Sequence, residues 1–162
     1  MSVVTEHLER RGSAFQVIPH QQAYTSLDEA RALGIDAGDV LKTLVVRAES
    51  RYALMVVPAS RRLDLHLVRE ALGDSRARLA TEDELSRDFA GYELGALPPL
   101  GALLGLDLYV DPEVLRHDTV AFAAGTQTES VKIRTDDLFG SERVTTVPLV
   151  RRAEPGSEER VW

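Results

Sequence analysis

The chain of 162 residues contains no cysteine, and this absence removes several kinds of chemistry. It can form no disulfide, no thiolate nucleophile and no zinc site with cysteine ligands. A cytoplasmic location is the simplest expectation for such a chain. There is no run of about 18 apolar residues to span a membrane, and the charged start, with Glu6, Glu9 and Arg10, does not resemble a signal peptide. No membrane partner is expected.

Histidine is scarce as well. The four histidines, His7, His20, His66 and His117, stand at no spacing typical of metal ligands. The sequence also lacks the Gly-x-Ser-x-Gly turn that presents a nucleophilic serine in many hydrolases. We therefore expect neither a metal nor a cofactor, and no serine or cysteine nucleophile.

The balance of charge limits the partners of the protein. A formal net charge of −7 argues against a protein that coats nucleic acid through its overall field. It leaves open contact with one end of a strand. A hydrophobic fraction of 44% and a length of 162 residues suit a single globular domain with one core.

Helix and strand signals alternate along the chain without a regular strand-helix-strand period. They predict a single α+β domain with a mixed, largely antiparallel, barrel-like sheet flanked by helices. We place this domain at residues 1–152 and a flexible tail at 153–162. Capping boxes are expected at Ser26–Glu29 and Thr81–Glu84. The expected helices are 3–11, 26–34, 64–73 and 81–91, with a helical turn at 135–140, and the expected strands are 14–18, 40–48, 52–58, 106–110, 120–124, 129–133 and 143–150.

Lysine is nearly absent, with only Lys42 and Lys132 among the nineteen basic residues. Strand side chains alternate between faces, so Lys42 shares a face with Val40, Leu44 and Val46. A cation on an apolar face must reach water or a ligand, or else have its pKa lowered by desolvation. Lys42 is therefore a candidate for chemistry, whereas Lys132 has the pattern of solvent-facing charge.

A second informative segment is the glycine- and proline-rich stretch 91–101. Pro98 and Pro99 fix the backbone, while Gly95 and Gly101 allow close approach of another group. Such a stiff loop loses little entropy on binding and can hold its amides toward an incoming carbonyl group. On its own, a loop of this composition more often serves only as a connector.

Taken together, these pieces resemble a known family. They are Lys42-Thr43-Leu44, Val57-Pro58, Arg62-Leu63-Asp64, Gly91-Tyr92 with Gly95, Pro99 and Gly101, Ala124-Gly125, and Asp137-Leu138. Their order and spacing, from about His20 to Leu138, are similar to the YbaK and prolyl-tRNA-synthetase-associated editing domains. The resemblance implies a trans-acting aminoacyl-tRNA deacylase, which hydrolyses the ester of a mischarged tRNA. A small amino acid such as alanine or cysteine, carried on tRNA-Pro, is the candidate substrate.

The same resemblance assigns roles to individual residues. Lys42 would position the terminal adenosine, and the segment from Gly95 to Pro99 would match the Gly-x-x-x-Pro loop that holds the aminoacyl end. The attacking water would be activated largely by the ribose hydroxyl of the substrate, so no protein base is required. The residues expected to bind substrate are His20, Tyr24, Thr25, Ala96, Leu97, Pro98, Gly101, Gly125 and Gln127. The implied partners are the acceptor end of a tRNA and, as a second candidate, an aminoacyl-tRNA synthetase, while the oligomeric state is left open.

Departures from the family pattern keep other functions open. Ala96 replaces a glycine found in many members, and Pro98 replaces a small or polar residue. After Gly125 some members carry a histidine or asparagine that selects the amino acid, whereas this sequence has Thr126-Gln127-Thr128-Glu129. For Tyr24 and Ser26 a packing and capping role competes with substrate binding, and for His20 a structural hydrogen bond does. The first alternative function is a non-catalytic module that binds a tRNA end or an aminoacyl group. A Schiff-base enzyme using Lys42 is a third reading, without a supporting companion acid.

Overall fold

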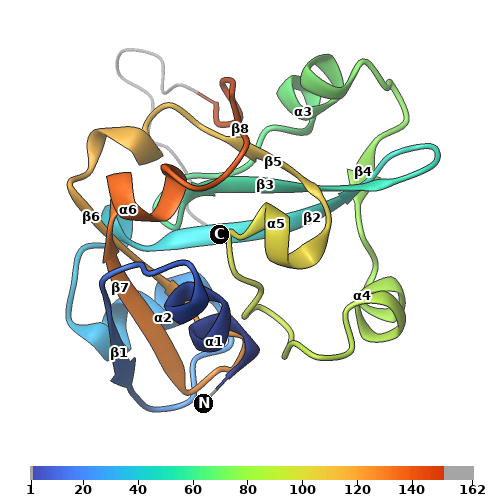
Figure 1. Ribbon diagram of the computed structural model, residues 1–162. Coiled ribbons are helices and arrows are strands. Elements are labelled where there is room, and N and C mark those ends of the chain that lie inside the picture. The colour runs from blue at the N-terminus through green and yellow to red at the C-terminus, as the bar shows by residue number, and fades with distance from the viewer. Residues whose placement is uncertain (1, 152–162) are drawn as a thin grey trace.

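The computed structural model describes residues 2–151 and contains two β-sheets with helices packed around them (Figure 1). The predicted tail at 153–162 lies outside the described residues. The helical elements are α1 (Val3–Arg10), α2 (Ser26–Leu33), η1 (Ala37–Asp39), α3 (Leu65–Leu72), α4 (Glu82–Asp88), α5 (Gly101–Leu104), η2 (Val114–Arg116) and α6 (Thr135–Phe139). The strands are β1 (Phe15–Pro19), β2 (Leu41–Arg47), β3 (Tyr52–Pro58), β4 (Arg78–Leu79), β5 (Asp107–Val110), β6 (Thr119–Ala123), β7 (Glu129–Arg134) and β8 (Val144–Thr146).

The strands are divided between a three-stranded sheet and a five-stranded sheet. The first has the order β1-β7-β6 with antiparallel pairing throughout, and the second has the order β4-β2-β3-β5-β8. In the larger sheet β2 pairs antiparallel with β3 and β4, while β5 pairs parallel with β3 and β8. The α+β prediction with a mixed, largely antiparallel arrangement is confirmed, and the sheets do not close into a complete barrel.

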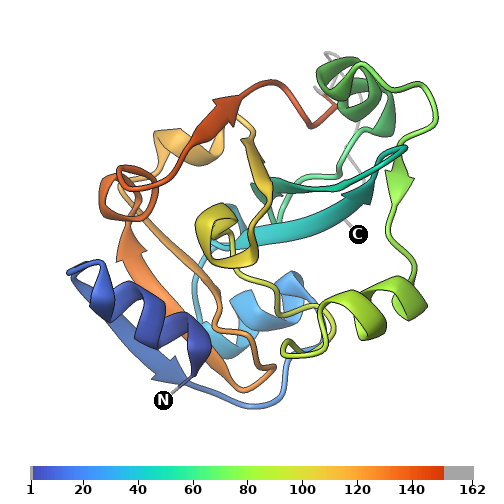
Figure 2. The same ribbon diagram turned by 45° about the vertical axis from the view of Figure 1, so that its right-hand side comes forward.

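The main core lies where the two sheets meet. Phe122 and Val131 of the smaller sheet pack with Leu54 and Val56 of β3, and the side chain of Leu8 on α1 joins them. A second cluster on the other side of the larger sheet joins Val46, Met55 and Val57 to α3 through Val68, among others. Both faces of β2 and β3 are therefore covered, which explains why these strands read as nearly continuous apolar runs. Figure 2 shows α1 beside the smaller sheet and α4 beyond β4.

Several local predictions need correction. The N-cap of α2 is Thr25, whose hydroxyl accepts a hydrogen bond from the Asp28 amide, so the capping box predicted at Ser26–Glu29 is wrong. Glu29 instead points inward and is buried. The Thr81–Glu84 capping box is confirmed, but α4 ends at Asp88 rather than near Gly91. The elements η1, β4 and α5 were not predicted, because each is too short to show a hydrophobic period.

Candidate functional site

A pocket of about 460 Å³ lies along one edge of β2. Its walls come from residues 24–26 at the start of α2, residues 41–44 of β2, Leu79 of β4, and Gly95 and Leu97 of the glycine- and proline-rich loop, among others. Most of this surface is apolar, with a few polar groups among the aliphatic side chains. A concave apolar surface with a few convergent polar groups is the usual form of a small-molecule site.

The pocket forms at this edge because β4 covers only part of β2. The two-residue strand β4 pairs with Val46 and Arg47, and the Ala80 amide donates to the carbonyl oxygen of Val45. Since the N–H and C=O groups of alternate strand residues point to the same edge, those of Thr43 point toward the pocket. The start of β2 is instead bridged to β6 through Val40 and Ala121. The side-chain oxygen of Thr43 is also buried and has no hydrogen-bond partner within residues 2–151. The pocket therefore offers strand-edge donors and acceptors that a ligand could use.

Lys42 is the lysine of this pocket. It is partly buried, and its Nζ donates a hydrogen bond of 2.8 Å to the carbonyl oxygen of Arg61. Burial lowers the pKa of Lys42, because a low-dielectric environment disfavours the ammonium form. An ammonium group has three donors, and this hydrogen bond uses one of them. The opposite residue on β3 is Val57 in the second core cluster, so the predicted apolar surroundings of Lys42 are confirmed.

Gly95 lies opposite the start of α2. It has a φ of +77°, and a Cβ atom at this position would collide with the carbonyl oxygen of Tyr24. Only glycine combines this left-handed backbone with such a close approach. The loop and the segment before α2 are therefore in direct contact at Gly95, with no space for a side chain between them.

Gln127 joins the glycine loop to the segment before α2 through hydrogen bonds. Its Nε2 donates to the Leu94 carbonyl at 2.9 Å, and its Oε1 accepts from Gln22 Nε2 at 2.8 Å. The backbone carbonyl of Gln127 accepts from the Ala23 amide at 2.8 Å, and its own amide donates to Glu93 Oε1 at 3.1 Å. This buried side chain therefore fixes the separation between the glycine loop and the segment before α2.

The structure brings together five of the residues predicted for the site: Tyr24, Thr25, Lys42, Gly95 and Leu97. The others lie outside the lining. Ala96, Pro98 and Pro99 are buried supports of the loop, and Gly101 begins α5, where a Cβ atom would meet the Leu106 carbonyl oxygen. Gly125 donates to the Ala96 carbonyl, and His20 contacts Ser130. The roles of all these residues toward a substrate stay predictions.

Other lining residues were not among those predicted to bind the substrate. Leu44 of β2, Leu63 and Leu65 at the start of α3, and Leu79 of β4 provide much of the apolar wall. A leucine in a strand or helix carries no local sign that distinguishes a pocket wall from a core. The unpaired edge of β2 could have been anticipated only by recognising that β4 is short.

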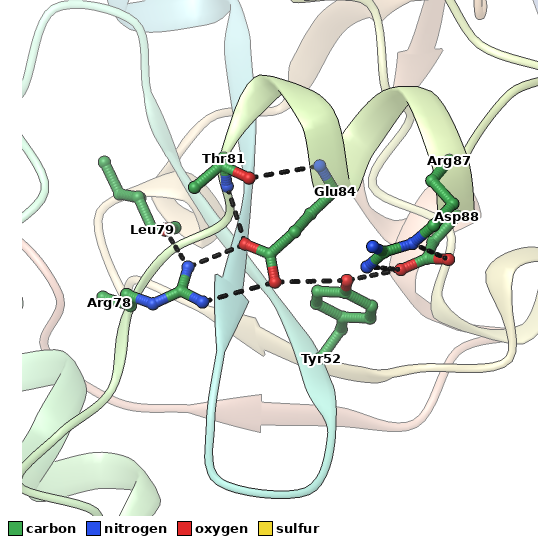
Figure 3. Close-up of polar contacts among 7 residues, drawn as sticks. All are labelled: Tyr52, Arg78, Leu79, Thr81, Glu84, Arg87 and Asp88. Atoms are coloured by element: carbon green, nitrogen blue, oxygen red, sulfur yellow. Dashed lines mark hydrogen bonds and ion pairs between the residues drawn. The ribbon is translucent and has the colours of Figure 1, made fainter.

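A polar cluster holds the segment beside the pocket in place (Figure 3). Arg78 donates to both carboxylate oxygens of Glu84, at 2.7 and 3.3 Å, and to the Leu79 carbonyl at 3.1 Å. Glu84 also accepts from the Thr81 amide at 2.9 Å. The Arg78 guanidinium and the Thr81 amide hold the pKa of Glu84 at about 2. The cluster thereby connects the start of α4 to β4, which carries the lining residue Leu79.

A second hollow lies at the other end of β4. It has a volume of about 670 Å³ and contains Arg47, Arg51, Arg76 and Arg78; we call it the arginine groove. Three of these side chains have partners: Arg51 pairs with Asp107 at 2.5 Å, Arg78 with Glu84, and Arg47 stacks on the Tyr52 ring at 4.7 Å. The groove is therefore polar, and two of its four arginines are paired with acids that lie just outside its lining.

Comparison with known proteins identifies the family. The profile of the aminoacyl-tRNA editing domain matches residues 20–140. The chain belongs to this family. It is 32% identical over 134 residues to a proline–tRNA ligase of Fervidobacterium nodosum, a match that covers 81% of this chain and 23% of the ligase. It is 24% identical over 110 residues to the uncharacterized protein YwhH of Bacillus subtilis, covering 67% of this chain and 69% of YwhH.

Solved structures agree with this membership. The fold matches the crystal structure of a candidate trans-editing enzyme for prolyl-tRNA synthetase with a TM-score of 0.78 and 26% identity, over 94% of this chain and 99% of the other. The hypothetical protein APE2540 matches in fold with a TM-score of 0.82, over 91% of this chain and 99% of the other, at 23% identity. Within residues 2–151 no helix is long and apolar enough to cross a membrane.

Proposed function

We propose that this editing domain acts in trans as an aminoacyl-tRNA deacylase. It would bind the 3′ end of a mischarged tRNA and cleave the ester between the amino acid and the terminal ribose. Water adds to the ester carbonyl, the bond to the ribose oxygen breaks, and the products are a free amino acid and a tRNA with its ribose hydroxyl restored. The observation that carries the proposal is a partly buried lysine in an apolar pocket within an editing-domain fold.

Lys42 would position the terminal adenosine through its phosphate or sugar oxygens. Its hydrogen bond to the Arg61 carbonyl directs the ammonium group, while two further donors are available to a ligand. In a partly desolvated site an ammonium attracts an anionic or polar oxygen more strongly than it would in water. The lysine therefore suits the binding and orientation of an anionic substrate end.

The opposite wall would hold the aminoacyl group. The glycine loop approaches the segment before α2 closely at Gly95, and the edge of β2 presents the N–H, C=O and unpartnered hydroxyl of Thr43. These groups can hydrogen-bond an ester carbonyl and an α-amino group without any catalytic side chain. The ribose hydroxyl of the substrate would activate the water, as the family resemblance implies.

The pocket volume limits the substrate. About 460 Å³ must accept a terminal nucleoside together with the amino acid, which favours a small side chain. Alanine and cysteine are the first candidates, and tRNA-Pro is the first candidate tRNA, because relatives include proline–tRNA ligases. A prolyl-tRNA synthetase is the corresponding candidate partner protein.

The test is a panel of tRNAs mischarged with small amino acids, each assayed for release of the amino acid by wild-type protein and by Lys42→Ala. We expect hydrolysis of at least one member and a loss of at least about tenfold in the variant. Binding without hydrolysis across the whole panel would favour the non-catalytic module instead. Lys132→Ala is the matched control, because Lys132 is an exposed lysine on β7.

A further inference from the structure

Three polar side chains form a hydrogen-bonded chain behind the pocket. The carboxylate of Glu29 on α2 contacts the hydroxyl of Ser130 on β7, and this hydroxyl also lies 2.7 Å from Nε2 of His20. The other ring nitrogen of His20, Nδ1, lies 2.7 Å from the carbonyl oxygen of Gln21. Glu29 is only 3% exposed and Ser130 is fully buried, so neither can replace these partners with water.

The Gln21 carbonyl determines where the protons of this chain lie. A carbonyl oxygen can only accept, so Nδ1 of His20 must carry a proton. All contacts are then satisfied in two arrangements. Either a protonated Glu29 donates to Ser130, which donates to Nε2, or a charged His20 donates to Ser130, which donates to the Glu29 carboxylate. Both arrangements contain the same number of protons, so one proton is shared between the carboxyl group and the imidazole through the hydroxyl.

This chain connects two walls of the pocket. Glu29 lies on the first turns of α2, where its amide donates to the Thr25 carbonyl, and Thr25 lines the pocket. Ser130 is paired in register with Ala123 of β6, which also lines the pocket. The contact between Glu29 and Ser130 therefore fixes the position of the α2 wall relative to the β6 wall.

We propose that Glu29, Ser130 and His20 act as positioning residues whose shared proton holds the α2 wall against the β6–β7 hairpin and so controls binding of the aminoacyl end. The binding part of this inference rests on the proposed function. None of the three residues lines the pocket, so their effect reaches the substrate only through Thr25 and its neighbours.

Loss of the shared proton breaks the chain. With Glu29 ionised and His20 neutral, Ser130 has a single proton and can donate to only one of its two neighbours. Burial raises the pKa of Glu29 to about 7, and the hydrogen bond from Ser130 opposes this shift. The proton is therefore held below neutral pH and lost above it.

Other charged groups near Glu29 are directed elsewhere. On α2 itself Asp28 pairs with Arg31 at 3.6 Å, and on the adjoining η1 Asp39 pairs with His117 at 2.7 Å. Lys42 on β2 donates to the Arg61 carbonyl. On the smaller sheet, Lys132 is exposed and Glu129 lies at the strand end beside Ser130. Burial and Ser130 are the causes of the shift in the pKa of Glu29, and these other charges are not among them.

The kinetic test measures KM and kcat for a mischarged tRNA from about pH 5.5 to 8.5. In wild-type protein KM should rise by about fivefold across this range. The value of kcat should change little once the rate of hydrolysis by free hydroxide has been subtracted. Glu29→Gln, whose amide always donates to Ser130, should keep the low KM at every pH. Ser130→Ala should show the high KM at every pH, and Lys132→Ala should keep the wild-type profile. A wild-type pH profile in Glu29→Gln would overturn the proposal.

A second measurement does not depend on hydrolysis. Nitrogen-15 NMR of His20 should report Nε2 changing from hydrogen-bonded to free as pH rises in wild-type protein, but not in Glu29→Gln. Amide exchange at Glu29 should become faster over the same pH range and in Ser130→Ala. If no tRNA is hydrolysed while both signals change as described, the proposed function is wrong, but the positioning role of Glu29, Ser130 and His20 is supported. If neither His20 nor the Glu29 amide responds to pH, the proposed positioning role is wrong, whatever activity is measured.

Discussion

The pocket at Lys42 and the arginine groove both border β4, yet they differ in what surrounds their charges. The groove is the larger hollow, at about 670 Å³ against about 460 Å³. Two of its four arginines, Arg51 and Arg78, are paired with the acids Asp107 and Glu84, so part of its positive charge is balanced. In the pocket, Lys42 meets a backbone carbonyl and aliphatic side chains instead. The comparison favours the smaller hollow as the candidate site, because its polar groups are less completely satisfied.

The first comparison concerns the glycines of the two hollows. Gly73 in the groove and Gly95 in the pocket both have positive φ, at +63° and +77°. A Cβ atom at Gly73 would meet nothing within 4 Å, whereas at Gly95 it would strike the Tyr24 carbonyl oxygen. Gly73→Ala should therefore lower the free energy of unfolding by about 1 kcal/mol, and Gly95→Ala by about 3 kcal/mol, since backbone overlap adds to strain. Denaturant unfolding of both variants tests this, and equal losses would contradict the close contact.

The pH dependence of stability should also differ between the two regions. Glu29 behind the pocket has a pKa raised to about 7 by burial, from 4.5, so its proton stabilises the folded state below pH 4.5 and this contribution is lost as pH rises through 7. The loss is on the order of 3 kcal/mol. Glu29→Gln should remove this dependence, as measured by unfolding at several pH values.

Asp74 in the groove provides the opposite case. Hydrogen bonds from the amides of Arg76 and Glu49 lower its pKa, so its stabilising effect is present above pH 3.8 and is lost as pH falls through the lowered value. Asp74→Asn should therefore change stability on the acid side only. If the stabilities of Glu29→Gln and Asp74→Asn departed from wild type over the same pH range, the assigned burial of Glu29 would be contradicted.

Substitution of the cations in the two hollows should have different effects on the rate of deacylation. Lys42→Ala is expected to reduce deacylation by at least about tenfold, or roughly 1.4 kcal/mol of transition-state stabilisation, without unfolding the protein. Lys42→Arg should also lose deacylation activity, because a planar guanidinium does not replace a compact ammonium in this space. Arg76→Ala in the groove should leave the rate within about twofold. A reversal of this order would move the substrate site to the arginine groove.

The smallest expected effect lies between the two hollows, in the cluster of Figure 3. Thr81→Ala removes the hydroxyl that accepts from the Glu84 amide at 3.1 Å. This change should cost about 1 kcal/mol of stability, as for other helix N-caps, with hydrolysis per folded molecule unchanged. A thermal shift together with a rate measured well below the melting temperature checks both parts. A large loss of rate would show that Leu79 depends on this cap for its position.

Local signals in the sequence were sufficient for most of the elements. Alternation along residues 40–48 placed Lys42 on an apolar face, and the Thr81–Glu84 pattern predicted the start of α4. The Ser26–Glu29 pattern failed although it has the same form, because the side chain of Glu29 found Ser130, 101 residues away, as its partner. A local pattern cannot reveal a competing partner from another strand.

The sequence by itself determined the α+β class, the family and the exceptional position of Lys42, because these depend on periodicity and on the order of short motifs. Only the tertiary structure decided what surrounds that lysine. The short pairing of β4 leaves the edge of β2 open, and the approach of Gly95 to Tyr24 closes the opposite wall. The tertiary structure also buries Glu29 and pairs two arginines of the groove with acids. These outcomes depend on contacts between distant segments, whose geometry is set by packing of the two sheets rather than by any neighbouring residue.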